Sequence, residues 1–161
     1  MFEWIRRRKV AGLLRKAKAR RMNKLRSLLL KHEGLRLTPY RDTVGKMTIG
    51  CGRNLDDVGI SQIEALLMLN NDLDRIQKEA IENFTWFKSI DTVRQDVVLN
   101  MLFNLGLSRF LKFRRFISWM SVQNYEKASE EMLNSLWATQ VGYRAKELST
   151  MMLTEMYPIE K

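Results

Sequence analysis

Two carboxyls near the front of the chain are the first residues whose types and spacing could do chemistry. Glu33 ends an apolar helical pattern and is followed by Gly34, a common helix stop. Its carboxyl is therefore expected at a helix C-terminus, where the helix dipole and partial burial both oppose ionisation. Asp42 follows beside a tight turn, in a more solvated setting. Carboxyls in unlike environments are what general acid–base cleavage of a glycosidic bond requires, although unrelated surface acids in a chain with 18 Asp and Glu could give the same pattern.

The elements that would position these carboxyls can be read from the surrounding sequence. Residues 38–53 are rich in Thr, Tyr, Val, Ile and Gly, with a turn at 42–45, and predict a short β-hairpin or small sheet. Ser61 and Glu64 then match a capping box. The apolar residues behind the capping box predict one face of a helix about twenty residues long: Leu66, Leu69, Leu73, Ile76 and Ala80.

The remainder of the chain predicts several shorter helices. An apolar stripe from Val93 to Leu105 ends at Gly106, Asn124 is a candidate helix cap, and a last helix is expected over residues 143–156. The expected fold is therefore α+β and mostly α. A small sheet lobe, a long connecting helix and a larger helical lobe would leave a cleft between the two lobes for a polar ligand.

Composition excludes several classes of protein and site. A length of 161 residues is enough for one core. Apolar runs as short as Leu28-Leu29-Leu30 predict no transmembrane helix. One cysteine excludes a disulfide framework, and one cysteine with one histidine excludes a zinc cluster of the usual spacing. We expect no metal and no cofactor.

The net charge of +10 comes from the N-terminal segment. Residues 1–31 hold 12 Lys and Arg against the single acid Glu3, whereas the rest of the chain is close to neutral. Residues 1–22 are interpreted as a basic helical extension ahead of the folded part, residues 23–161. This extension is either a solvated or frayed helix or an arm for anionic membranes or lipopolysaccharide, for which Trp4 and the cations are suited. A translation start at Met22 is a further alternative.

Several motifs, in order along the chain, resemble the phage-type lysozyme (endolysin) family, glycoside hydrolase family 24. Glu33-Gly34 is followed by Tyr40-Arg41-Asp42 and by Thr48-Ile49-Gly50-Cys51-Gly52. The spacing from Glu33 to Asp42 to Thr48, nine and six residues, is the catalytic spacing of that family. Residues 100–106 resemble its central buried helix and residues 137–145 its Trp…Gln…Arg-Ala motif. Residues 23–161 would then form a lysozyme-like catalytic domain, with a two-lobed fold.

The resemblance implies a role for each of the three matched residues. Glu33 would be the general acid that protonates the leaving glycosidic oxygen. Asp42 would stabilise the oxocarbenium-like transition state and help to hold the nucleophilic water. Thr48 would share that water, since a hydroxyl can donate and accept at once. Because the family inverts configuration, the two carboxyls should be separated by roughly 6.5–9.5 Å.

The resemblance also implies supporting residues. Arg144 would pair with Glu33. The residues that would line the sugar cleft, or that belong to the C-terminal motif supporting it, are Phe103, Asn104, Trp137 and Gln140. Arg53 stands where the family often has a histidine, and Asp72 matches the aspartate paired with that histidine. We therefore expect an Arg53–Asp72 ion pair.

The expected function is that of a muramidase, an endolysin that cleaves the β-1,4 bond between N-acetylmuramic acid and N-acetylglucosamine in peptidoglycan and lyses the host cell. The alternative is a non-catalytic protein that binds cell wall or anionic envelope on a lysozyme fold. The presence of Glu33, Asp42 and Thr48 favours the enzyme. We expect a monomer with no nucleic-acid partner. It would act from the host cytoplasm and reach the wall through a pore made by another protein.

Overall fold

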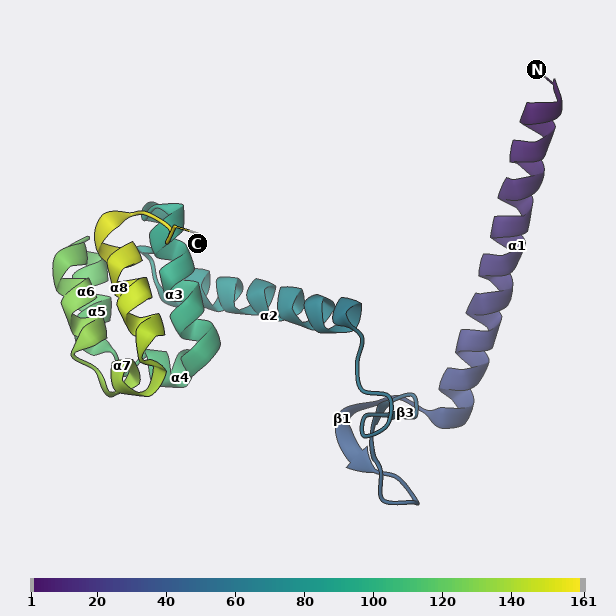
Figure 1. The fold of residues 1–161 in the computed structure, drawn as a ribbon, viewed down its shortest axis with the longest axis horizontal. Coiled ribbons are helices and arrows are strands. Elements are labelled where there is room, and N and C mark those ends of the chain that lie inside the picture. The colour runs from purple at the N-terminus through teal and green to yellow at the C-terminus, as the bar shows by residue number, and fades with distance from the viewer. Residues whose placement is uncertain (1, 160–161) are drawn as a thin grey trace. The chain divides into compact units, whose positions relative to one another are not determined.

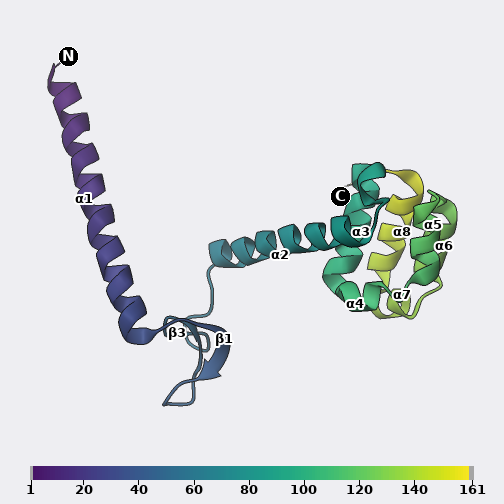
Figure 2. The ribbon, with the colours of Figure 1, turned by 180° about the vertical axis from the view of Figure 1, so that it is seen from behind.

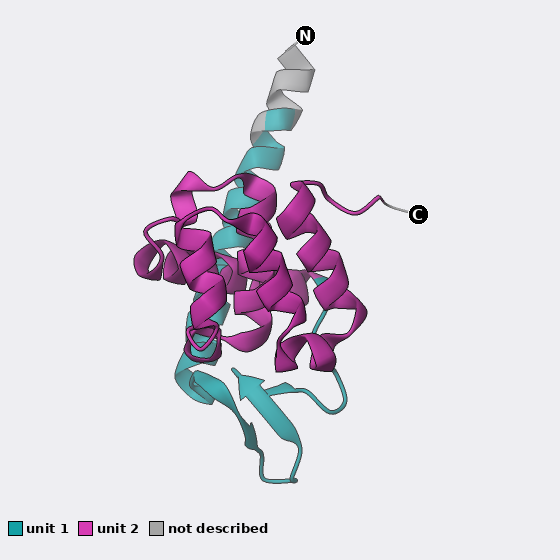
Figure 3. Cartoon of the chain, turned by 90° about the vertical axis from the view of Figure 1, so that its left-hand side faces the viewer, with its two compact units in different colours: residues 1–62 teal, residues 63–161 magenta. Residues whose placement is uncertain are grey.

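The structure, a computed structural model, describes residues 2–159 (Figure 1). The side chains of residues 2–7 and 9 lie outside what it describes, and with them the predicted interfacial role of Trp4. The chain folds into two compact units, residues 1–62 and residues 63–161, which Figure 3 distinguishes by colour. The first unit contains the small sheet and the second contains most of the helices.

The first unit begins with α1 (Phe2–Glu33), a single unbroken helix. It runs through residue 22 without interruption, and the division of the chain at that residue stays a prediction. The helix ends at Gly34, which has φ +71° and donates its N–H to the Leu30 carbonyl at 3.0 Å. Residues with a Cβ rarely adopt this left-handed conformation, so a glycine here fixes where the helix stops.

The small sheet of the first unit follows directly. Its strands are β1 (Arg36–Arg41), β2 (Met47–Gly50) and β3 (Arg53–Asn54), in antiparallel order β1-β2-β3. Tyr40 pairs with Thr48 and Arg41 with Met47, and the register shifts between Arg36 and Tyr40. The β-hairpin predicted over residues 38–53 is confirmed. Its two long strands connect through the expected turn at 42–45.

The long helix α2 (Gln62–Asn83) begins directly after Ser61, where the capping box predicted a start. Only the second half of its predicted apolar face is buried, at Ile76 and Ala80. Leu66, Leu69 and Leu73 are 50%, 38% and 41% exposed. The core of the second unit therefore covers α2 only from about Ile76 onward, which the periodicity of the sequence did not indicate.

The remaining helices of the second unit form a bundle. Their bounds are η1 (Phe87–Ser89), α3 (Thr92–Leu105), α4 (Leu107–Phe110), α5 (Arg114–Ser121), α6 (Tyr125–Leu133), α7 (Leu136–Val141) and α8 (Tyr143–Thr154). Helices α5, α6 and α8 lie side by side in Figures 1 and 2, and α3 packs on α8. Asn124 caps α6 by accepting from the Lys127 N–H, and Gly106 ends α3, as expected.

The core of this unit is built from methionine, aromatic and aliphatic side chains. Trp137 is buried and stacks edge-on against Phe113, with 6.3 Å between ring centroids. Burial of side chains of this size contributes roughly 1.5–3 kcal/mol each. Five methionines are among the buried side chains: Met101, Met120, Met132, Met151 and Met152. The expected fold class, mostly α with a small sheet, is confirmed. No helix within residues 2–159 combines the length and apolarity needed to cross a bilayer.

Arg94 ties the end of α8 to the start of α3. Its side chain is almost fully buried and donates to the Met152 carbonyl at 2.8 Å, to Asp91 at 2.6 Å and to Glu155 at 3.1 Å. Its guanidinium also lies 3.7 Å from the centre of the Tyr125 ring. Burial alone would raise the pKa of the Asp91 carboxyl, but hydrogen bonds from the Arg94 backbone and guanidinium bring that pKa below its ordinary value.

Candidate active site

The end of α1 places the Glu33 carboxyl beside the turn that joins β2 to β3. A Cβ built on Gly52 would lie 3.6 Å from Glu33 Oε2, so the carboxyl lies next to bare backbone there. Gly52 has φ +79°, and its missing side chain leaves this approach open. Glu33 itself is exposed. Within the first unit glycine backbone is found beside this carboxyl, and the partial burial expected at this position stays a prediction.

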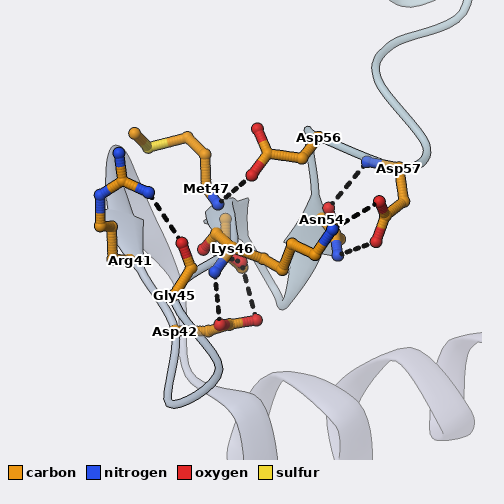
Figure 4. Close-up of polar contacts among 9 residues, drawn as sticks. Arg41, Asp42, Gly45, Lys46, Met47, Asn54, Asp56 and Asp57 are labelled. Carbon is orange, nitrogen blue, oxygen red and sulfur yellow. Dashed lines mark hydrogen bonds and ion pairs between the residues drawn. The ribbon is translucent and has the colours of Figure 1, made fainter.

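Asp42 is fixed by the hairpin turn (Figure 4). Its Oδ1 accepts from the Lys46 N–H at 2.8 Å and from the Val44 N–H at 3.0 Å. Its own N–H donates to the Lys46 carbonyl at 2.9 Å, and its carbonyl accepts from the Gly45 N–H at 3.0 Å. Side-chain and backbone hydrogen bonds thus close the same turn. One carboxyl oxygen is committed to the turn, and the other lies toward Thr48.

Thr48 presents a buried hydroxyl to this second oxygen. The residue is 3% exposed, and its Oγ1 lies 3.5 Å from Asp42 Oδ2 and 3.2 Å from the Lys46 carbonyl oxygen. The single hydroxyl proton can be donated to only one of these acceptors at a time, while the oxygen can accept from a water. A contact of 3.5 Å is long for O–H···O and is a distance at which a bridging water is considered. The structure thus brings Asp42 and Thr48 together as a pair.

A second set of polar contacts fixes the opposite edge of the sheet (Figure 4). The Met47 N–H donates to Asp56 at 3.0 Å, and Lys46 Nζ lies 2.9 Å from the Asp57 carboxyl. Asn54 Nδ2 also donates to Asp57, at 2.9 Å. The sequence had assigned no such contacts to these residues. The Met47 hydrogen bond fixes the backbone next to Lys46, whose own N–H donates to Asp42.

Arg53 and Asp72 each have a partner within their own part of the chain. Arg53 Nη1 donates to the Gly59 carbonyl at 3.2 Å, so it ties down the loop after β3. Asp72 lies 3.0 Å from Arg75, one turn further along α2. The Arg53–Asp72 ion pair expected from the resemblance stays a prediction.

In the second unit, the residues of the C-terminal motif are linked to α3. Trp137 Nε1 donates to Asn104 at 2.8 Å, and Arg144 Nε donates to Asn100 at 2.8 Å. Phe103 is 46% exposed at the end of the same helix. The pairing of Arg144 with Glu33 stays a prediction. Asn100 was missed as the partner of Arg144, although a polar residue inside an apolar stripe was a signal for such a role.

A groove of about 670 Å³ lies at the surface of the second unit, lined in part by Trp137 and Gln140. Its cations come from α4, α5 and the segment between them: Arg109, Lys112, Arg114 and Arg115. Glu131 lies 3.7 Å from Arg115. The sequence had marked Gln140 and Trp137 but none of these cations. Within the described residues, no group of three or more His, Cys, Asp or Glu side chains could hold a metal ion.

Comparisons with known proteins indicate the family of the chain. Residues 30–152 match the family model described as phage lysozyme. The chain is 25% identical to the probable T4-type lysozyme 1 of Dictyostelium discoideum, over 83% of this chain and 95% of that protein. It is 28% identical to an endolysin of Acyrthosiphon pisum secondary endosymbiont phage 1, over 66% and 73% of the two chains. It is also 27% identical to the pre-baseplate central spike protein Gp5 of Enterobacteria phage T4, over 83% of this chain and 28% of that protein.

These matches confirm the resemblance on which the site residues were placed. The family match includes Glu33, Asp42 and Thr48, as well as Trp137 and the other residues of the C-terminal motif. It covers well over half of the chain and spans both the sheet and the helical bundle. The chain therefore belongs to the phage lysozyme family and is a glycoside hydrolase of the lysozyme type, which degrades peptidoglycan.

Proposed function

We propose that the chain cleaves the β-1,4 bond between N-acetylmuramic acid and N-acetylglucosamine of peptidoglycan, with inversion at the anomeric carbon. The observation that carries this proposal is the Asp42–Thr48 pair. Two backbone N–H groups hold Asp42 Oδ1, and Oδ2 lies 3.5 Å from a buried hydroxyl. An acceptor carboxyl beside a hydroxyl that both donates and accepts is suited to orienting one water molecule for attack.

In this mechanism Glu33 donates its proton to the glycosidic oxygen while the bond to the anomeric carbon breaks. The water oriented by Asp42 and Thr48 attacks that carbon from the opposite face, and Asp42 accepts the proton that the water loses. The positive charge that develops on the sugar is stabilised by the carboxylate of Asp42. A single displacement of this kind gives the inverted anomer and no covalent intermediate.

The decisive comparison is Glu33→Gln against Glu126→Gln. The first variant removes the proposed acid, and the second changes an exposed glutamate of α6 in the same way. On purified peptidoglycan we expect Glu33→Gln to lower the rate of release of reducing ends by ~10²–10⁴-fold, because an amide cannot donate the required proton. Glu126→Gln should keep the wild-type rate. Similar rates for the two glutamine variants would remove Glu33 from the mechanism.

The stereochemistry is measured separately. Proton NMR of the first product formed from a β-linked substrate should show the α-anomer before mutarotation. An initial β-anomer would exclude inversion. A wild-type chain that binds purified cell walls and releases no reducing ends would support the alternative, a non-catalytic wall-binding protein. We further propose that the hydrolysis serves lysis of the bacterial host and that the chain acts as a monomer, whose mass in solution light scattering measures.

A further inference from the structure

The basic arm, residues 8–21 of α1, carries a high density of positive charge and none of the residues proposed for hydrolysis. From residue 4 to residue 32 the sequence contains twelve Lys and Arg and no Asp or Glu. Acids that could neutralise a helix surface from one turn away are therefore absent along the whole arm. The side chains from Leu13 to Met22 are all exposed. This stretch of helix is a solvent-facing polycation.

An apolar strip occupies the first part of the arm, residues 10–17, and ends at Arg21, which follows on the same helix face. Val10, Leu13, Leu14 and Ala17 recur at the i, i+3, i+4 and i+7 positions of one helix face. Val10, Leu13 and Leu14 are 49%, 67% and 66% exposed. At about 100° per residue, Lys16 and Lys18 project from opposite sides of this strip. Over these two turns, exposed leucines bordered by cations match the composition of a helix segment that lies in the plane of a membrane interface.

The arm lies ahead of the segment that the lysozyme family shares, since the family match begins at residue 30. Its charge and its leucines therefore lie outside the family match. The helix nevertheless continues without a break to Glu33. Regular helix thus connects the arm to Glu33, the proposed catalytic acid.

We propose that residues 8–21 bind flat on the surface of a bilayer that contains anionic phospholipids, with the Val10–Ala17 strip facing the acyl chains. The lipid phosphates complement the cations, and the leucines favour this surface over a nucleic acid duplex, whose surface presents phosphates, sugars and base edges. Each Lys or Arg near an anionic leaflet strengthens binding about fivefold at low salt, and the effect declines within a Debye length.

The test uses the full chain and co-sedimentation with two kinds of vesicle. One contains phosphatidylglycerol and phosphatidylcholine in equal amounts, and the other contains phosphatidylcholine alone. The variant Lys16→Gln/Lys18→Gln removes two arm cations. Its matched control, Lys88→Gln/Lys146→Gln, removes two exposed lysines of the helical unit and has the same net charge. A third variant, Leu13→Gln/Leu14→Gln, keeps the charge and removes the centre of the strip.

We expect wild type and the matched control to bind the anionic vesicles, and Lys16→Gln/Lys18→Gln to bind roughly 25-fold more weakly at low salt. Leu13→Gln/Leu14→Gln should also bind these vesicles more weakly, and high salt should weaken the binding of every variant to them. The proposal is overturned if the two lysine variants bind alike, if binding does not depend on phosphatidylglycerol, or if the chain prefers duplex DNA to vesicles. All three variants should keep the wild-type rate on purified peptidoglycan, so this test is independent of the proposed catalytic mechanism.

Discussion

Asp42→Asn and Asp42→Ala should separate the two roles of this side chain. In the structure Oδ1 accepts two backbone N–H bonds that close the hairpin turn, whereas Oδ2 lies toward Thr48. Asparagine keeps an acceptor oxygen for the turn and places an amide group in the position of Oδ2. Alanine removes both. Both variants therefore lack the carboxylate that would accept a proton, but only the alanine variant also loses the acceptor that closes the turn.

The magnitudes follow from the bonds that each variant loses. Asparagine replaces a charged acceptor by a neutral one at two hydrogen bonds, which should lower the free energy of unfolding by about 1 kcal/mol. Alanine loses both bonds and should cost about 2–3 kcal/mol, since each hydrogen bond to a charged group contributes roughly 1.5 kcal/mol or somewhat more. Hydrolysis should fall by about 100-fold or more in both variants, because neither can accept the proton from the water.

Stability is measured by urea denaturation and, locally, by hydrogen exchange of the Lys46 amide, which donates to Asp42 Oδ1 at 2.8 Å. Activity is measured as the release of reducing ends from peptidoglycan. Asp57→Asn is the matched control, because it removes a carboxylate in the turn after β3 that lies 2.9 Å from Lys46 Nζ. If Asp42→Asn stays within a few-fold of wild type, Asp42 has no role in the reaction. If the two Asp42 variants are equally stable, the hydrogen bonds to Asp42 Oδ1 do not stabilise the turn.

Two further changes test other parts of the structure. Thr48→Val removes only a buried hydroxyl and should cost about 1 kcal/mol of unfolding free energy and lower activity by roughly tenfold or more, whereas Thr43→Val in the exposed turn should leave both near wild type. A wild-type rate for Thr48→Val would exclude the water-holding role. Arg94→Met leaves Asp91 and the α8 carbonyls without their donor and should cost about 3 kcal/mol in thermal unfolding. Since Arg94 lowers the folded-state pKa of Asp91, that stabilisation is present above about pH 4 and is lost as the pH falls through the folded value. The difference from wild type should therefore shrink in acid, and a constant difference would refute the linkage.

Local signals in the sequence were sufficient for most of the secondary structure. The stop at Gly34, the cap at Asn124 and the hairpin around residues 42–45 each depend on neighbours a few residues away. Their geometry is therefore determined largely by the chain itself. The same holds for the Asp42–Thr48 pair, since both residues lie on one hairpin and their spacing fixes the register.

Contacts between distant parts of the sequence were not predictable in this way. Arg94 meets Glu155 across 61 residues and Arg144 meets Asn100 across 44. Periodicity places an arginine on a surface and gives no indication of a partner so far along the chain. Leu66 and Leu73 show the converse. An apolar pattern states which side of a helix is suited to burial, but what covers that side depends on tertiary packing.

Because α1 is unbroken, the angle about the helix axis between the apolar strip and Glu33 is fixed. Twenty-three residues separate Val10 from Glu33, so at about 100° and about 1.5 Å per residue the acid lies roughly 150° around the axis from the centre of the apolar strip. With the strip against a bilayer, Glu33 would face away from the lipid. The direction of the Glu33 side chain is then set by the number of helical residues between it and the strip. Two residues inserted within it would rotate the acid by about 200° relative to the strip, whereas seven would return it close to its original heading.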